Sequence, residues 1–183
     1  RRKTKGADGM YFTYTEENPI SFNPFYTDDY VFDVEKKDSI KTLLLTLWKT
    51  EDDKITKTES GELGSAVSAY IERIRSDRSI IPSLNTFYEY MRDDYRREME
   101  ERDIRVRRED FDIDNLLVTL RQYYRGGRYD FLLNSTENID LLSKRFIVFE
   151  IDSIKENREL FPVVTIIIME AFIKKMSYLC IRM

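Results

Sequence analysis

The fold of this chain is most constrained near its C-terminal end, where an apolar, β-branched segment precedes a very apolar helical segment. Residues 146–151 form a run of apolar residues that only Glu150 interrupts. Such a run is typical of a strand covered on both faces, and these strands occur mainly in parallel sheets flanked by helices. The sequence therefore predicts a strand over 146–151 within a parallel sheet.

The segment after this strand predicts a helix that is buried on most sides. Asn157 can cap it, Pro162 falls in its first turn, and 163–169 is apolar around nearly the whole circumference. The apolar stretch 161–173 contains Glu170 and is shorter than the roughly 20 residues of a membrane-spanning helix, so we expect a buried helix. So few strands would leave sheet edges and an apolar flank exposed, and we expect partner strands from outside the chain.

The N-terminal part predicts a short strand followed by an irregular loop. Residues 11–14 are aromatic and β-branched, which favours a strand. Asn18-Pro19 and Asn23-Pro24 then interrupt regular structure, because both residue types favour turns. Residues 1–6 are basic but precede no apolar signal-peptide core, so we interpret them as part of a loop and expect no export signal.

Between these ends, apolar residues recur at helical spacing. Asp38 is a candidate cap of a first helix that should end near Lys49, and 51–62 is so polar that we expect a mobile loop. A second helix follows, and a third begins after Pro82 with Ser83 as its cap. The three apolar stripes are Ile40, Leu43, Leu44, Leu47 and Trp48; Leu63, Val67, Tyr70, Ile71 and Ile74; and Leu84, Phe87, Tyr88, Met91, Tyr95 and Met99.

A fourth helix should run from about Asp112 to Tyr124, with Leu116, Leu117 and Leu120 on its apolar face. Gly126-Gly127 can supply the left-handed conformation that ends a helix. The stripe over 84–99 could line a binding groove, but core packing is the commoner cause of such a pattern.

The residue types present exclude several kinds of site. The chain has 183 residues, enough for one globular domain with a core, but it contains no histidine and a single cysteine, Cys180. A Ser-His-Asp triad, a histidine zinc site and an internal disulfide are therefore excluded, and a metal site would have to be built from carboxylates. A single thiol suits a reducing compartment, so we expect a cytosolic location.

The charge pattern argues against a dominant nucleic-acid-binding surface. The net charge is -4, and the arginines concentrated over 92–108 are interleaved with acidic residues. Pairs such as Glu98 with Arg102 have the four-residue spacing of ion pairs along a helix. We interpret this segment as a solvated, self-paired helix face, with a DNA-contacting face as the alternative.

Five stretches together resemble the TraG-type conjugation ATPases. These are motor subunits of bacterial type IV secretion systems, as found on conjugative transposons of Bacteroides-like bacteria. The resemblance covers nearly the whole chain, and it is specific in combination although each stretch alone is weak. The stretches are 11–14 (YFTY), 22–29 (FNPFYTDD), 42–49 (TLLLTLWK), 127–134 (GRYDFLLN) and 145–176.

The resemblance implies an α/β fragment dominated by α, in which a helical subdomain is inserted in part of a RecA-like P-loop ATPase core. Residues 1–36 would be a strand and loop of that core, 37–133 the helical insertion, and 134–183 the return to the core, with a strand at 146–151 and a buried helix at about 158–177. The chain would lie between the Walker A and Walker B motifs. None of its six glycines begins a phosphate loop, so we expect no ATPase activity from the chain alone.

The resemblance also implies a function for the intact protein, namely powering type IV secretion and conjugal DNA transfer with ATP and magnesium. Its partners would be other secretion subunits and further copies of the ATPase, at the cytoplasmic side of the bacterial inner membrane. Direct DNA binding by this part is not expected. The alternative is a free-standing helical module that grips a partner protein through the 84–99 face or the arginine-rich helix.

Two groups of residues are candidate site residues, although neither the sequence nor the resemblance assigns them a role. Phe149, Glu150 and Asp152 belong to a family stretch, and two carboxylates flanking one strand residue would project to the same side, where they could hold magnesium or activate water. The commoner explanation for such a pair is that it marks the exit of the strand into a turn. Asn23-Pro24-Phe25 is either a family loop with a function or an ordinary turn anchored by its phenylalanine.

Overall fold

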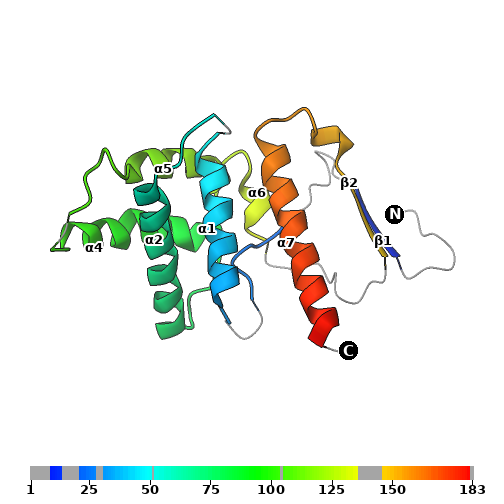
Figure 1. Ribbon diagram of the computed structural model, residues 1–183, viewed down its shortest axis with the longest axis horizontal. Helices are drawn as coiled ribbons and strands as arrows, with labels where there is room; N and C mark the ends of the chain where they lie inside the picture. The colour runs from blue at the N-terminus through cyan, green and yellow to red at the C-terminus, as the bar shows by residue number, and fades with distance from the viewer. Residues whose placement is uncertain are drawn as a thin grey trace.

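The computed structural model describes residues 9–13, 21–27, 31–50, 52–103, 105–135 and 146–181. In Figure 1 a body of helices occupies one end of the molecule and two short strands occupy the other. Helix α7 (Leu160–Ile181) lies between them, against α1 on one side and near β2 on the other. The described chain is thus an α/β structure in which helices dominate.

The two strands, β1 (Gly9–Thr13) and β2 (Phe146–Glu150), pair in parallel. The register places Tyr11 opposite Val148 and Thr13 opposite Glu150. Both strand predictions and the parallel sheet are therefore confirmed. Since every helix from α1 to α6 lies between β1 and β2 in the sequence, the sheet brings together the two ends of a long, mostly helical excursion.

The first helix, α1 (Val34–Trp48), begins earlier than predicted. Its cap is Asp33, whose carboxylate accepts the backbone N–H of Lys36 at 2.8 Å, whereas Asp38 lies inside the helix and pairs with Lys41. The prediction of Asp38 as the cap was wrong because the first turn precedes the apolar stripe and faces solvent, where hydrophobic spacing gives no signal. The predicted end near Lys49 is confirmed.

The second helix, α2 (Lys57–Ser76), shows that the predicted mobile loop over 51–62 was too long. Thr56 forms a capping box in which its hydroxyl accepts the N–H of Glu59 at 3.1 Å, and the Glu59 carboxylate accepts the N–H of Thr56 at 2.8 Å. These two bonds satisfy helix-end donors without any apolar residue. A polar first turn therefore folds where composition alone suggested a loop.

The third helical segment is a single rod with a local change of pitch. It consists of α3 (Leu84–Tyr90), a π-helical stretch over Met91–Tyr95, and α4 (Arg96–Glu100). Ser83 caps it as predicted. The predicted stripe lies in the core rather than in an open groove, with only Met99 partly exposed. Apart from Met99, the 84–99 face is therefore occupied by core packing.

The remaining short helices close the helical body. Helix α5 (Ile113–Leu120), capped by Asp112, continues as a 3₁₀ turn to Tyr123, and α6 (Asp130–Leu133) follows, so the predicted fourth helix is confirmed. Of the two glycines after it, Gly126 has a φ of 76°. Gly127 is required for a different reason, because a Cβ there would collide with the backbone carbonyl of Gln122.

Helix α7 is buried on one side and exposed on the other. The Asn157 side chain accepts the N–H of Leu160 at 3.0 Å, which agrees with its predicted capping role. The side chains that pack into the core are Val163, Val164, Ile167 and Ile168. Met169 and Phe172 are 55% and 44% exposed, so the described part of this helix keeps the uncovered apolar flank that the sequence predicted.

Candidate functional site

The candidate site at the sheet lies where the two parallel strands end. In open α/β sheets, ligands bind beyond the carboxyl ends of the strands. Here those ends bring Thr13 of β1 beside Glu150 of β2, although the two residues are far apart in the sequence. The predicted site residue Glu150 therefore stands at the edge where the chemistry of such folds is found.

The Glu150 carboxylate is held by two hydroxyl groups from β1. Its Oε2 atom accepts hydrogen bonds from the Tyr11 hydroxyl at 3.1 Å and from the Thr13 hydroxyl at 3.2 Å. Because side chains alternate along a strand, these three share one face of the sheet, and Phe149 faces the other side. There the Phe149 ring meets Phe172 of α7 with 6.3 Å between centroids. The carboxylate thus lies on the sheet face opposite α7.

Asp152 does not join Glu150 as a strand pair. The strand ends at Glu150, and Asp152 begins a 3₁₀ turn over Asp152–Ile154. The prediction that the two carboxylates project to the same side of a strand was wrong, because the two-residue alternation stops with the strand. Asp152 instead lies 4.0 Å from the Lys155 ammonium. Within the described ranges, no group of three or more acidic or cysteine side chains is placed to hold a metal ion.

The Asn23-Pro24-Phe25 segment follows β1 in the sequence and anchors the point where the chain enters the helical body. We call this entry, together with the exit near Ser135, the joint. The Asn23 carboxamide accepts the N–H of Phe25 at 3.0 Å and donates to the carbonyl of Pro82 at 2.9 Å. Phe25 is fully buried and lies between Tyr70, at 5.7 Å in an edge-to-face arrangement, and Phe87, at 5.6 Å in a stacked one. These contacts give the segment a structural role.

A second part of this joint was missed by sequence reasoning. The backbone N–H of Phe22 donates to the carbonyl of Leu132 at 2.8 Å, and the N–H of Ser135 donates to the carbonyl of Phe22 at 3.1 Å. These two bonds hold the segment by which the chain enters the helical body against the segment by which it leaves. Backbone groups carry the pairing, so no residue type in the sequence signals it.

Asn134 reinforces the exit from the helical body. Its carboxamide oxygen accepts the N–H of Asn85 at 2.9 Å, and its amide group donates to the carbonyls of Tyr123 and Asp130, both at 2.9 Å. It thereby ties α3, the end of α5 and α6 together. An isolated Asn after a short apolar run carries no sequence signal that would distinguish this role from an ordinary turn.

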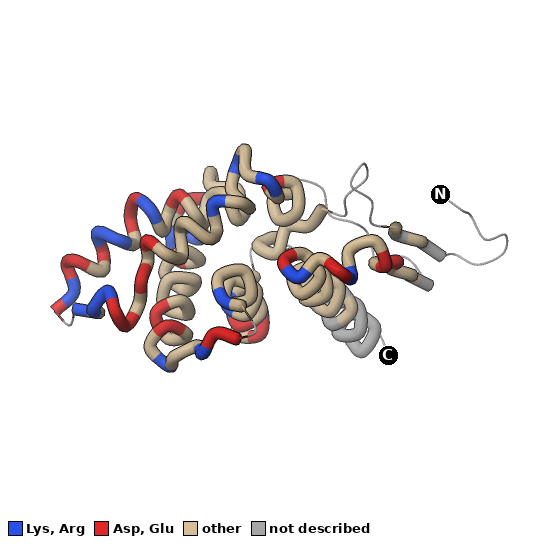
Figure 2. Tube along the Cα trace, turned by 90° about the horizontal axis from the view of Figure 1, so that it is seen from above, with Lys and Arg blue, Asp and Glu red and all other residues tan. Residues whose placement is uncertain are grey.

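The arginine-rich region makes ion pairs both within its own segment, as Arg97 does with Asp94, and with other helices, as Arg96 does with Asp114. Glu98 accepts a hydrogen bond from the Tyr90 hydroxyl at 2.9 Å, while Arg102 donates to Glu62 of α2 at 2.8 Å. The predicted Glu98–Arg102 pair was therefore wrong, because α4 ends at Glu100 and the helical spacing no longer applies. Figure 2 shows Lys and Arg interspersed with Asp and Glu over this end of the molecule, which supports the predicted self-paired surface.

The parallel strands, the long helical excursion between them and the candidate carboxylate at a strand end define an α/β chain. The chain matches the family model described as the TraG P-loop domain over residues 3–182, and it therefore belongs to that family. This confirms the resemblance to TraG-type conjugation ATPases and places the chain among conjugative-transfer ATPases.

No curated protein sequence matches this chain. Among the helices of the described ranges, none combines the length and the apolar character that crossing a bilayer requires.

Proposed function

We propose that this chain is the part of a conjugative motor ATPase that lies between the phosphate loop and the acidic strand of a RecA-like core. One observation carries the proposal: a chain of the TraG P-loop family places β1 and β2 as parallel neighbours, with Gly9 opposite Phe146 and helices α1 to α6 between them in sequence. A subdomain inserted between two core strands leaves these strands adjacent in the sheet while the helical body separates them in the sequence.

The joint described above supports the inserted arrangement. The sequence places residues 1–36 and 134–183 in the core and 37–133 in the inserted helical subdomain. Because α1 begins at Val34 and Phe25 packs on Tyr70 and Phe87, we propose that the insertion extends over residues 22–135. The chain enters the helical body near Phe22 and leaves it near Ser135, where backbone bonds hold the two connections together. Closely spaced connections let a subdomain be inserted without displacing the strands on either side.

The chemistry of the intact motor would come from motifs that the printed sequence does not contain. Phosphate binding in P-loop proteins needs a glycine-rich turn followed by Lys and Ser or Thr, and no such pattern is present. We therefore propose ATP and magnesium as ligands of the intact protein and assign no catalytic or nucleotide-binding residue to this chain. Glu150 stands at the sheet edge where those ligands would bind.

The proposed role of the intact protein is to power type IV secretion or conjugal DNA transfer, as on a conjugative transposon. It would work at the cytoplasmic side of the bacterial inner membrane, with other secretion subunits and with further copies of itself. Family membership supports this role. The exposed apolar flank of α7, at Met169 and Phe172, supports contact with further core elements.

The test compares phosphate release by the purified chain with release by a protein extended on both sides with the flanking coding sequence of its source genome. We expect magnesium-dependent release only from the extended protein, because the phosphate loop supplies most of the charge stabilisation in phosphoryl transfer. The matched control is the extended protein with the phosphate-loop Lys replaced by Ala.

Two results would overturn the proposal. One is turnover by the purified chain alone that survives removal of contaminating ATPases. The other is the absence of a phosphate loop upstream and of an acidic strand downstream in the flanking coding sequence.

A further inference from the structure

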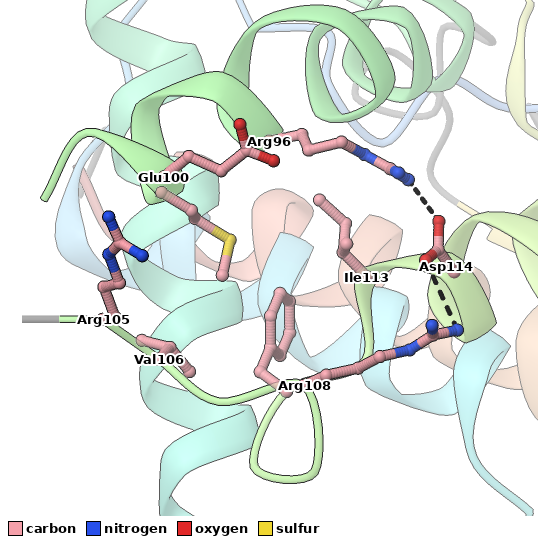
Figure 3. Close-up of a pocket in the computed structure, with 9 residues that line it drawn as sticks. Arg96, Glu100, Arg105, Val106, Arg108, Ile113 and Asp114 are labelled. Carbon is pink, nitrogen blue, oxygen red and sulfur yellow. Dashed lines mark hydrogen bonds and ion pairs between the residues drawn. The ribbon is translucent and has the colours of Figure 1, made fainter.

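A half-open pocket of about 500 Å³ lies in the helical body, at the end remote from the strands. It is formed by α4, by the connection over 105–111 and by the first turn of α5. In Figure 3, Arg105 and Val106 lie on one side, Arg96 and Asp114 lie on the other, and Ile113 lies between them. No residue of the proposed motor chemistry contributes to this pocket.

The interior of the pocket is apolar and firmly supported. Met99, Val106, Phe111 and Ile113 contribute its apolar lining. Phe111 is 2% exposed and packs edge-to-face on Trp48 of α1 with 5.6 Å between ring centroids. The other three are only partly buried, so each packs on the core and still offers apolar surface to the pocket. Such a lining suits an apolar side chain better than water.

The charged groups around this apolar surface are unevenly paired. The lining contains Arg96, Arg105 and Arg108 against Glu100 and Asp114, an excess of one positive charge. Both Arg96 and Arg108 direct their guanidinium groups to the Asp114 carboxylate, the second at 3.4 Å.

One donor group in this lining remains available. Among the described residues, Arg105 has no carboxylate within ion-pair distance, so its guanidinium group can bind an acceptor that enters the pocket. The pocket therefore combines an apolar cavity with unused capacity for a negatively charged acceptor.

We propose that this pocket docks a short peptide segment of a partner protein, in which an apolar side chain fills the cavity and a neighbouring carboxylate binds Arg105. The charge excess fits an acidic ligand, and the four apolar residues fit a side chain such as Leu or Phe. A nucleic acid fits less well, because its successive phosphates would meet Glu100 and Asp114 in the same lining.

The test uses the full chain and a pool of short fluorescein-labelled peptides that carry one apolar residue, varied among Leu, Ile, Met and Phe, between two Asp residues. Two control pools replace Asp by Lys or the apolar residue by Ser. Fluorescence anisotropy measures affinity, and the methyl NMR signals of Met99 and Ile113 report whether binding occurs in the pocket. We expect the acidic apolar pool to shift those signals and both control pools to bind about tenfold more weakly.

Two substitutions of charged residues at the rim of the pocket should change its affinity for the peptide in opposite directions. Arg105→Glu should weaken binding about tenfold, whereas Glu100→Gln should tighten it about twofold by removing a repulsive charge. The matched control is Arg107→Glu in the same connection, because Arg107 pairs with Asp110 and lies outside the lining. It should change the affinity by less than about twofold. Far-UV circular dichroism verifies that each variant is folded.

Three results would overturn the proposal. The first is that no member of the acidic pool binds with a Kd below about 1 mM, the limit of weak specific binding. The second is that Arg107→Glu weakens binding as much as Arg105→Glu, which would indicate general charge attraction. The third is that a single-stranded oligonucleotide, rather than any peptide, shifts the Met99 and Ile113 signals.

Discussion

Replacing Phe25 with Ala tests whether the Asn23-Pro24-Phe25 segment is a structural joint. Phe25 is fully buried, and its ring contacts Tyr70 and Phe87 from two directions. Truncating a buried Phe to Ala removes its hydrophobic transfer free energy and leaves a cavity, at a cost of about 3–5 kcal/mol. Rigid aromatic neighbours cannot collapse fully into the space, so we expect about 4 kcal/mol.

Urea denaturation followed by circular dichroism measures this loss. With a slope of about 2 kcal/mol per molar urea, the midpoint should fall by about 2 M. If the Ala variant does not fold, Phe25→Leu keeps most of the volume and should cost only about 1 kcal/mol. Val118→Ala is the matched control, because Val118 is 75% exposed on α5 and should change stability by less than about 0.5 kcal/mol.

The reasoning would be refuted if Phe25→Ala lost no more stability than Val118→Ala. Such a result would mean that the phenylalanine is not an anchor of the helical body. The family stretch around it would then need another explanation, such as contact with a ligand or with a neighbouring core element.

Three substitutions and one change of pH test single structural claims by the same denaturation assay. Thr56→Ala removes the capping box of α2 and should cost about 1 kcal/mol, with faster amide exchange in the first helical turn; unchanged exchange would contradict it. Gly127→Ala places a Cβ against a backbone carbonyl and should cost about 2 kcal/mol, whereas Gly61→Ala, with open space in mid-helix, should stabilise by about 0.5–1 kcal/mol. Burial raises the pKa of Tyr95 to about 12, above the ordinary value of about 10, so its stability contribution is complete below pH 10 and is lost as the pH rises towards 12. A urea midpoint that stays constant over that pH range would refute this last prediction.

Sequence periodicity was reliable wherever an element buries one face. The stripes of α2, α3 and α5, and the apolar run of β2, lay in the described structure where the spacing placed them. Periodicity failed to locate the first turns of α1 and α2, because both turns face solvent and are stabilised by the Asp33 and Thr56 caps. Both cap residues are of types that favour helix N-termini, but several nearby Asp and Thr residues could have served as the cap equally well.

The candidate site was less predictable than the fold. Glu150 was found from its place in an apolar strand, but its partners Tyr11 and Thr13 come from the opposite end of the described chain. The Phe22–Ser135 joint is made by backbone groups, which every residue except proline carries in the same form. The pocket beside α4 depends on the path of the connection over 105–111, which has no periodic pattern in the sequence.

The sequence by itself determined the local elements, the exclusion of histidine and disulfide chemistry, and the family, because these depend on residue types and their short-range spacing. Only the tertiary structure decided that β1 pairs with β2, that Phe25 anchors the helical body, and that three arginines surround an apolar pocket. These features join residues distant in the chain. Such contacts form when apolar side chains are buried together, and many pairings satisfy the same local pattern before the whole core selects one.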